Sequence, residues 1–432
     1  MKKKAIFTVM VILMLFVTAM VFMASCSDSS KKASQSEQLV NWWHIGTAAN
    51  DRVMNENFAN EFMKANPNVK IEITVLENEA FKTKLTTVMQ SGNPPDVFQT
   101  WGGGVLAQYA EAGLVKDITK YVKGTEWGNS MAPGVWEVYS SGGKVYAAPN
   151  DAGCITFWYN KDLLAKVGYT EFPSDWDDFI AMVKKLKTAG IIPIALGGGD
   201  KWPAMHMWSY IALRIGGPQL FQDTFSGKNT LGFEHPDFIK AGEMLAELTA
   251  LKPFQDGFLG ATYNDEAALV GNGEAAMELM GQWAPNVQKD NSSSKEGIGE
   301  KLAAAPFPSV KGGKGTVTEV IGGGGGFAIG SNASEAAVDF VKFLTNKENQ
   351  ITIAKTNGSL VTTKGAEVGI SDPNAKMVKA LVDKCTFFQL YLDQFLTPAA
   401  GGTVNDSVQT ILAGTATPAQ ACAAIQAAFS NN

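Results

Sequence analysis

Several of the ten tryptophans in this chain follow stretches that are expected to form β-strands. Trp42 and Trp43 end the first of these stretches, and Trp283 follows a later one. Gln99 and Trp101 stand at the end of a third stretch. Ligands of open α/β sheets bind beyond the carboxyl ends of the strands, and flat rings with a few polar groups suit the C–H faces and hydroxyls of a sugar. The pattern therefore favours a carbohydrate site built from aromatic side chains.

Polar candidates stand at further positions of the chain. Asn150 and Asp151 could form a turn, or they could offer an amide and a carboxylate to the hydroxyls of a ligand. The glycine run 322–326 lacks the Lys-Ser/Thr pair and the helix of a phosphate-binding loop. Glycines let the backbone come close to a ligand or to another strand. Gly324 and Gly325 therefore join the candidate binding residues.

Catalysis is the main alternative for a site of this kind. A glycosidase needs two carboxylates about 5–10 Å apart. Asp96, Asp151 and Asp393 could supply them, but no stretch of the chain resembles a glycosidase. The three histidines are scattered without the spacing of a metal site, and no Gly-x-Ser-x-Gly motif is present. We therefore expect a binding protein with no enzymatic activity, no cofactor and no metal.

The elements that must position these residues alternate between strand and helix. The β-α-β-α-β order of the first part predicts parallel strands with helices on the faces of the sheet. Its strands are expected at residues 39–45, 69–75 and 96–99, and its helices at 51–65 and around Phe81–Met89. A second unit is expected from Ala152 onward. Its first long helix should follow a capping box of Ser174 and Asp177.

The start of the chain has the layout of a bacterial signal peptide. Three lysines precede an apolar run from Ala5 to Met23, and small residues lead from there to Cys26. The run is long enough to span a membrane, but the placement of the cysteine argues against an uncleaved span. We expect residues 1–25 to be removed. Residues 26–37, rich in Ser, Lys and Gln, should form a flexible tether.

Charge, length and cysteine content narrow the class of protein. The formal net charge is −6, and the loss of three lysines with residues 1–25 makes it −9. A mixed acidic surface argues against a nucleic-acid partner. A mature chain of about 400 residues is too long for one core, so two domains are expected. Cys154, Cys385 and Cys422 allow at most one disulfide and match no zinc spacing, which favours buried free thiols.

A set of short stretches, in a fixed order, resembles the extracellular solute-binding proteins of carbohydrate importers, in the maltose- and glucose-binding group. The stretches are Trp42-Trp43, Ser91–Trp101, Gly143–Pro149, Phe157–Lys161, Gly273–Met277, Gly281–Trp283, Tyr391–Gln394 and Pro418–Ala421. The resemblance covers residues 38–430 and implies an α/β, two-lobe periplasmic-binding-protein fold of type II. Each lobe would be a mainly parallel sheet flanked by helices, with the ligand cleft between the lobes.

The resemblance also implies where the chain divides. Each lobe would be discontinuous in sequence, with residues 38–150 plus 308–345 in lobe one and 151–307 plus 346–432 in lobe two. The segments that cross between the lobes would be Ala147–Asp151 and Ala304–Pro308. Met23-Ala24-Ser25-Cys26 resembles the lipobox of bacterial lipoproteins, with Met23 where Leu is usual. That likeness implies acylation of Cys26 and anchoring in a membrane.

The function implied is that of a monomeric, extracytoplasmic, membrane-anchored sugar-binding lipoprotein. It would capture a mono- or oligosaccharide and deliver it by hinge closure to the membrane permease subunits of an ATP-binding cassette importer. A binding protein for a non-sugar solute and a secreted glycoside hydrolase are the alternatives. Trp283 matches the stacking tryptophan of the maltose-binding group, and Trp42 and Trp43 match a pair in glucose-binding members. Trp202 and Asp393 complete the candidate site.

Not every tryptophan is expected to meet a ligand. Trp42 and Trp43 are neighbours on a strand and point to opposite faces, so one of them could belong to the core. We nevertheless expect Trp283 to face one member of this pair across the cleft. The tryptophans assigned to packing are Trp127, Trp136, Trp158, Trp176 and Trp208.

Overall fold

The computed structural model describes residues 37–431 of the chain. The expected signal peptide, Cys26 and nearly all of the expected tether lie outside the described residues. Within residues 37–431, no helix is both long and apolar enough to cross a membrane.

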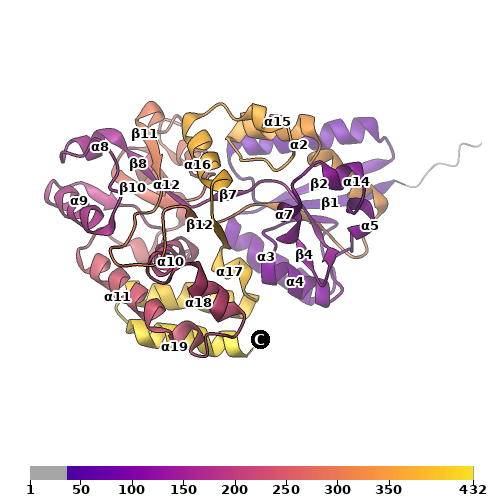
Figure 1. Cartoon of the computed structure of the whole chain (residues 1–432). Helices are drawn as coiled ribbons and strands as arrows, with labels where there is room; N and C mark the ends of the chain where they lie inside the picture. The colour runs from indigo at the N-terminus through magenta and orange to yellow at the C-terminus, as the bar shows by residue number, and fades with distance from the viewer. Residues whose placement is uncertain (1–36, 432) are drawn as a thin grey trace, which may run out of the picture. The chain divides into compact units, whose positions relative to one another are not determined.

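A five-stranded sheet forms the first lobe, in the order β2-β1-β3-β13-β6 (Figure 1). Side chains alternate along β2, the edge strand of this sheet. Val69 and Ile71 are buried, while Lys70 and Glu72 are exposed, so one face of the strand packs on the core. β1 and β3 run parallel, with Trp42 opposite Val97. The strand bounds are β1 Gln38–His44, β2 Val69–Val75, β3 Val97–Thr100, β6 Ala147–Pro149 and β13 Gly326–Ile329.

Helices cover both faces of this sheet. One apolar cluster joins α2 and α14 to one face, and another joins α3 and α4 to the other. The expected β-α-β-α-β order of this region is confirmed. Further short elements complete the lobe. The bounds are α2 Ala49–Ala65, α3 Asn78–Gln90, α4 Gly103–Glu111, α5 Thr119–Val122, α6 Glu126–Asn129, α7 Pro133–Glu137, α14 Glu335–Leu344, α15 Lys347–Asn357, β4 Ser140–Ser141 and β5 Lys144–Val145.

The second lobe is built on a four-stranded sheet in the order β11-β8-β10-β9. Its central strand, β10, is buried along its whole length. β10 runs parallel to β9 but antiparallel to β8, and β8 is antiparallel to β11. The strand bounds are β8 Thr156–Asn160, β9 Ile192–Ile194, β10 Ala275–Met280 and β11 Leu302–Ala305.

The expectation of mainly parallel sheets is wrong in both lobes. β13 pairs antiparallel with β3 and with β6, and β8 pairs antiparallel with β10. The reason lies in the direction of chain entry. β8 and β13 each follow a segment that comes from the other lobe, so they start at the edge where β10 and β3 end.

A three-stranded sheet marks where the chain passes between the lobes. Its order is β14-β12-β7, with bounds Phe387–Leu390, Glu319–Gly323 and Gly153–Cys154. β6 leads to β7 through residues 150–152, close to the expected crossover at Ala147–Asp151. The return passage, from β12 to β13, is at Gly324–Gly325 and not at Ala304–Pro308.

Arg214 explains why residues 308–323 stay with the second lobe. Its side chain is buried in α10 and donates hydrogen bonds to the carbonyl oxygens of Phe307, Pro308 and Glu319. The segment after β11 is therefore tied to α10. α15, by contrast, stays with the first lobe, because it packs against α2 and its Ile353 belongs to a core cluster of that lobe. The expected lobe boundaries thus differ from the strand pairing and side-chain contacts at 308–323 and from the helix packing at 347–357.

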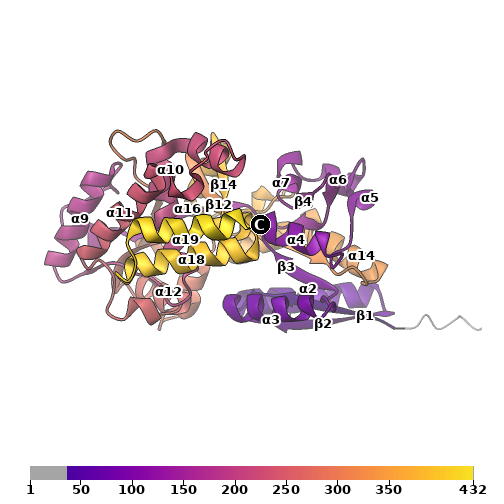
Figure 2. The same cartoon turned by 90° about the horizontal axis from the view of Figure 1, so that it is seen from below.

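Helices surround the second-lobe sheet, and α18 and α19 lie side by side (Figures 1 and 2). α9 follows an N-cap at Asp175, so the expected capping box of Ser174 and Asp177 is wrong by one residue. Trp158, Trp176 and Trp208 are buried in the core, as expected. The helix bounds are α8 Lys161–Ala165, α9 Trp176–Thr188, α10 Trp202–Phe225, α11 Pro236–Ala250, α12 Tyr263–Gly271, α13 Ala284–Asn291, α16 Pro373–Asp383, α17 Leu392–Phe395, α18 Pro398–Leu412 and α19 Pro418–Ser430.

Candidate ligand-binding site

A cavity of about 270 Å³ lies between the two lobes. The first lobe lines it with residues at and beyond the carboxyl ends of β1 and β3, including His44, Gln99 and Trp101. The second lobe lines it with Trp202 at the start of α10 and Trp283 just after β10. The cavity is therefore placed where open α/β sheets hold their ligands.

The fold brings most of the predicted binding residues together. Ten of the eleven line the cavity: Trp42, Gln99, Trp101, Asn150, Asp151, Trp202, Trp283, Gly324, Gly325 and Asp393. Trp43 does not line it. Because side chains alternate along β1, Trp43 lies on the opposite face from Trp42. There it packs beside α3, with the Lys84 ammonium 4.6 Å from its ring centre.

Trp42 is mainly a core residue, although it borders the cavity. Its side chain is only 1% exposed, and its ring meets Phe340 and Phe327 edge-on at centroid distances of 5.1 and 6.1 Å. The Trp42 Nε1 atom is buried and has no hydrogen-bond partner among the described residues. Trp42 therefore offers a polar edge and no open ring face, and the expected stack of Trp283 against the Trp42–Trp43 pair is not available.

An aromatic cluster from the second lobe forms one wall of the cavity. Trp202 meets Tyr263 at a centroid distance of 5.1 Å and Trp283 at 6.4 Å. Trp283 also meets Tyr391 edge-on at 6.2 Å. Tilted and edge-to-face contacts of this kind fix the rings relative to one another. We call Trp202, Tyr263, Trp283 and Tyr391 the aromatic wall.

The first lobe presents Trp101 with a charged group over it. Phe81 packs edge-on against the Trp101 ring, and the Lys82 ammonium lies 5.6 Å from its centre. Lys82 also pairs with Asp393 of α17 at 3.5 Å and with Glu79 at 3.1 Å. Burial acts to lower the pKa of Lys82, but these two carboxylates outweigh it and raise that pKa. The positive charge at this end of the cavity is therefore already paired.

Asp151 ties together the two segments that cross between the lobes. Its Oδ1 atom accepts hydrogen bonds from the Gly325 N–H at 3.1 Å and from Gln282 Nε2 at 3.2 Å. Its Oδ2 atom accepts from Asn150 Nδ2 at 3.0 Å. Burial raises the pKa of Asp151 to about 6, against the effect of these donors.

Gly324 is explained by the close approach of the same two segments. A Cβ atom at Gly324 would lie 1.8 Å from the carbonyl oxygen of Asp151. Of the two interpretations of the glycine run, approach of another strand therefore holds at this position. Gly325 leaves room for Gln99, since a Cβ there would lie 2.5 Å from Gln99 Nε2.

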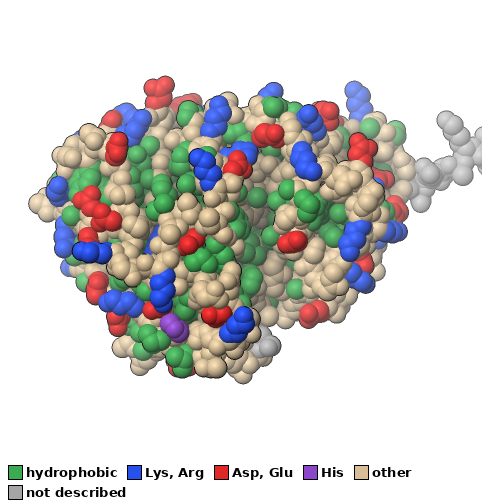
Figure 3. Space-filling model, in the orientation of Figure 1, with side chains coloured by type: hydrophobic (Ala, Val, Ile, Leu, Met, Phe, Trp, Pro, Cys, Tyr) green, Lys and Arg blue, Asp and Glu red, His purple; other side chains and the backbone are tan. Residues whose placement is uncertain are grey.

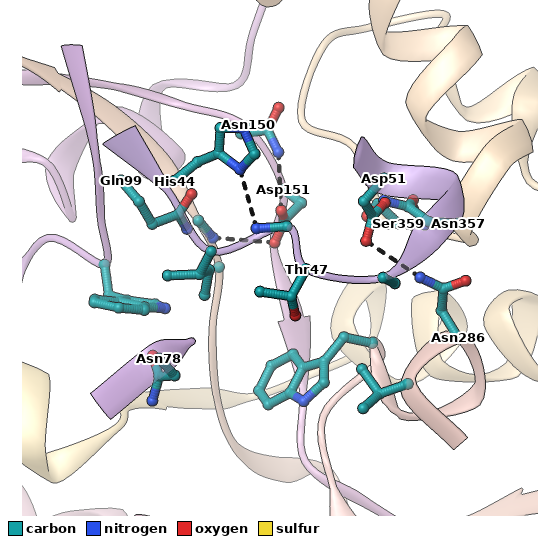
Figure 4. Close-up of a pocket in the computed structure, with 18 of the residues that line it drawn as sticks. His44, Thr47, Asp51, Asn78, Gln99, Asn150, Asp151, Asn286, Asn357 and Ser359 are labelled. Carbon is teal, nitrogen blue, oxygen red and sulfur yellow. Dashed lines mark hydrogen bonds between the residues drawn. The ribbon is translucent and has the colours of Figure 1, made fainter. Parts of the chain in front are cut away.

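The cavity also contains polar residues that the sequence did not single out. Figure 4 shows these residues around the cavity beside the predicted ones. They include His44, Thr47, Asp51, Asn78, Asn286, Asn357 and Ser359. His44 could have been found, because strand alternation puts it on the same face as Trp42. The others stand in loops and at helix ends, and only the fold brings them together.

Asp51 links the lobes at one rim of the cavity. The Asp51 carboxylate of α2 accepts hydrogen bonds from Asn286 Nδ2 of α13 at 3.2 Å and from Asn357 Nδ2 at 2.8 Å (Figure 4). Asn286 in turn accepts from Asn50 Nδ2 at 2.7 Å. We call Asn50, Asp51, Asn286 and Asn357 the rim latch. Burial raises the pKa of Asp51, with Asn357 acting against it.

Several buried polar atoms at the cavity have no partner among the described residues. They include Trp42 Nε1, His44 Nε2, Trp202 Nε1, Gln282 Oε1, Tyr391 Oη and both ring nitrogens of His206. Burial lowers the pKa of His44 and of His206 to about 4, so both imidazoles are neutral at neutral pH. A buried polar group without a partner costs about 1–3 kcal/mol. These neutral donors and acceptors are therefore suited to a ligand rich in hydroxyl groups.

The described residues offer no metal site and no disulfide. No group of three or more His, Cys, Asp or Glu side chains within residues 37–431 could hold a metal ion. Cys154, Cys385 and Cys422 are free thiols. On the face shown in Figure 3, lysines and arginines are interspersed with aspartates and glutamates, in line with the expected mixed surface.

Comparison with known proteins gives a consistent set of similarities. Residues 46–351 match the family model described as bacterial extracellular solute-binding protein. A protein of Mesorhizobium japonicum named "Probable sugar-binding periplasmic protein" is 30% identical over 278 residues, and the alignment covers 64% of each chain. The match thus spans just under two thirds of that relative's length. The "Multiple sugar-binding protein" of Streptococcus mutans is 25% identical over 380 residues, which is 84% of this chain and 85% of the relative.

Solved structures share the fold over nearly their whole length. A chain from work on xylan utilization by the thermophilic bacterium Caldanaerobius polysaccharolyticus superimposes with a TM-score of 0.83 at 28% identity, covering 90% of this chain and 99% of that one. A chitin oligosaccharide binding protein gives a TM-score of 0.82 at 24% identity, covering 91% and 98%.

Proposed function

Because the chain belongs to the family of bacterial extracellular solute-binding proteins, we propose that it captures a neutral sugar and hands it to an importer. The family match covers most of the chain, and the similar solved structures are two-lobe periplasmic binding proteins of type II, which confirms the expected fold class. The family consists of solute-binding proteins, which supports a binding role over catalysis. Its sugar-binding relatives support a carbohydrate as the solute.

One observation carries the proposal of a sugar. The aromatic wall and a set of neutral, unpartnered polar atoms line the same cavity. Rings suit the apolar C–H faces of a sugar, while indole N–H, imidazole and amide groups suit its hydroxyls. A ligand that contacted the rings and bonded to the polar atoms would bury apolar area, and it would remove the free-energy cost of leaving those atoms unpaired.

Charge at the cavity disfavours the alternative solutes. Of the described residues that line it, Lys82 is the one cation at neutral pH, and Asp393 and Glu79 already pair with it. A phosphate or carboxylate ligand would therefore meet no free positive partner. Asp51 and Asp151 already accept hydrogen bonds from amides on both of their oxygens, and Asp393 is paired with Lys82, so an amine would have to compete with these donors.

The same contacts disfavour a glycoside hydrolase. A catalytic carboxyl must reach the glycosidic oxygen, the anomeric carbon or the attacking water. Asp151 has a raised pKa, but its oxygens are held by Gly325, Gln282 and Asn150 at the crossing segments. We propose that Asp151 is a structural residue of the hinge whose neighbours meet the ligand.

We further propose that the two lobes close around the sugar as a hinge. The crossing segments lie side by side, and the rim latch joins α2 of the first lobe to α13 of the second. Closure of this kind changes the shape of the binding protein, so an importer can distinguish the loaded protein from the empty one. The partners would be the membrane permease subunits of an ATP-binding cassette importer, met by a monomer outside the cytoplasm. Acylation of Cys26 would anchor the protein to the membrane.

A ligand screen tests the proposal directly. A ligand that binds the native state must raise the melting temperature. We expect a rise with one or more neutral mono- or oligosaccharides, and none with sugar phosphates, amino acids or polyamines. A rise with an amine, peptide or phosphate and with no neutral sugar would overturn the proposal.

A further inference from the structure

Two glutamates are buried next to each other behind the aromatic wall. Glu266 of α12 is 1% exposed, and Glu278 of β10 is fully buried. α12 packs against β10, and the charge of Glu278 acts on Glu266. Of the ion pairs within residues 37–431, none involves either glutamate. Two unpaired like charges in contact cannot both stay ionised at neutral pH.

The hydrogen bonds around the pair leave one oxygen of Glu278 without a donor. Glu266 Oε2 accepts from the Gly197 N–H at 2.6 Å, and Glu278 Oε1 accepts from Gln288 Nε2 at 2.6 Å. Glu278 Oε2 accepts no hydrogen bond from an amide or from any other group that is always protonated. A proton on Glu266 supplies that donor. Burial first, and then the charge of Glu278, raise the pKa of Glu266 well above its usual range, and burial raises the pKa of Glu278 to about 7.

The segments that meet at this pair also carry the aromatic wall. α12, which holds Glu266, begins with Tyr263, and β10, which holds Glu278, leads directly to Trp283. The loop containing Gly197 leads to Trp202 at the start of α10. Asp200 in that loop accepts a hydrogen bond from the Tyr263 N–H at 2.7 Å.

Gln288 adds α13 to the same junction. This helix carries Gln288 against Glu278 and Asn286 of the rim latch, and Trp283 is its N-cap. The pair is therefore the point at which α12, β10, α13 and the loop before α10 are held together.

We propose that Glu266 and Glu278 share one proton and that this pair, while it is protonated, positions the aromatic wall and α13 at the ligand cleft. Loss of the shared proton places two adjacent negative charges in the interior and drives these segments apart. The pair acts through the wall and does not touch the ligand. The inference rests on the proposed cleft but not on the identity of the sugar.

The surroundings contain nothing that would neutralise the second charge. Asp200, from the loop before α10, and Tyr263, from α12, are the titratable groups that face the pair, and neither is a cation. β8 places Trp158 opposite Glu278, and α13 presents the uncharged Gln288. Deprotonation is therefore opposed by low dielectric and by like charge together.

The sign of the pH effect follows from the raised pKa values. Unfolded glutamates titrate near pH 4.5, whereas the folded pair keeps its proton above that pH. The unfolded chain then binds fewer protons than the native state, so the free energy of unfolding falls as pH rises. The fall begins near pH 4.5 and continues above pH 7, until the pair has lost its last proton.

The test compares wild type with Glu266→Gln. A glutamine at this position donates an N–H to Glu278 Oε2 and accepts from Gly197 with its carbonyl, as the protonated acid does. Between pH 7 and 9 the melting temperature of the wild type should fall by about 1–2 °C per pH unit, and that of Glu266→Gln should stay level. Glu274→Gln, an exposed glutamate just before β10, should behave like the wild type.

Two further measurements distinguish an effect on the position of the aromatic wall from an effect on overall stability alone. Infrared spectra of the wild type at pH 8 should contain a protonated carboxyl band that Glu266→Gln lacks. Tryptophan fluorescence of the wild type should change over the pH range of the stability loss, because Trp202 and Trp283 move. Should Glu266→Gln fail to fold, Glu278→Gln can serve, since its amide donates to Glu266 and accepts from Gln288. Equal pH dependence in wild type and variant, or failure of both variants to fold at pH 6, would overturn the proposal.

Discussion

The Gly325 N–H donates a hydrogen bond of 3.1 Å to the Asp151 carboxylate, and this contact joins the two segments that connect the lobes. The Asn150 N–H donates in the other direction, to the Gly325 carbonyl oxygen at 2.8 Å. The hinge is thus a pair of bonded segments. A third segment lies beside them, where the Ala152 N–H donates to the Leu360 carbonyl oxygen at 2.8 Å.

Gly324→Ala should damage this hinge. The new Cβ would lie 1.8 Å from the Asp151 carbonyl oxygen, so the crossing segments would have to separate. Overpacking of this kind costs about 1–3 kcal/mol, and denaturant unfolding should show that loss together with weaker ligand binding. Gly402→Ala in α18 is the control, since a Cβ there meets no atom within 4 Å. Equal stability of Gly324→Ala and the control would contradict this description of the hinge.

Asn286→Ala should weaken the closed arrangement of the lobes. The change removes the hydrogen bonds of Asn286 to Asp51 and Asn50 across the rim of the cavity. We expect a larger radius of gyration in solution scattering and weaker sugar binding, with little change in melting temperature. Asn291→Ala on the same helix is the control, because the Asn291 side chain bonds only within α13, to Val287. A radius of gyration and an affinity unchanged from wild type would show that the rim latch does not hold the lobes together.

Cys26→Ser should release the protein from the membrane or block its processing. Acyl chains on this cysteine would supply the anchoring. Fractionation of cells and mass spectrometry of the mature protein measure this. Cys385→Ser, a change of a half-buried free thiol, should leave the protein at the membrane. An unmodified Cys26 in the membrane-bound wild type would contradict lipid anchoring.

The order of elements in the first lobe could be predicted from the sequence because it depends on local patterns. The strand expected at 69–75 has the observed bounds, since its alternation is set by a half-buried sheet. The return crossover could not be placed, because it depends on the contact of Arg214 with Pro308 and Glu319, which are distant in sequence. The strand directions in the second lobe were missed for the same reason.

The candidate site was predictable where strand ends could be recognised. Gln99 was placed at the cavity by this reasoning, and Asp151 by its expected position at a crossing between the lobes. Trp43 was wrongly included, because the resemblance outweighed the alternation that sends its side chain to the other face. Asn286 and Asn357 come from helix ends far apart in the chain. No local pattern marks such residues, and their role depends on how the lobes meet.

Calorimetric titration of Trp283→Ala with the sugar identified by the ligand screen measures whether the ligand rests on the Trp283 ring. Trp283 is half-buried at the cavity and held by Trp202 and Tyr391, so its loss should remove a ring surface without opening the core. We expect the dissociation constant to rise roughly 10- to 100-fold, with the fold intact.

Trp176→Ala is the matched control for that titration. Trp176 is buried in the second-lobe core and stacks on Phe307 at 5.8 Å, away from the cavity. Its loss should lower the melting temperature, because removing a buried aromatic costs about 3–5 kcal/mol, while sugar affinity in the folded protein stays close to that of the wild type. A Trp283→Ala protein that binds the sugar as tightly as the wild type would contradict the placement of the ligand against the aromatic wall.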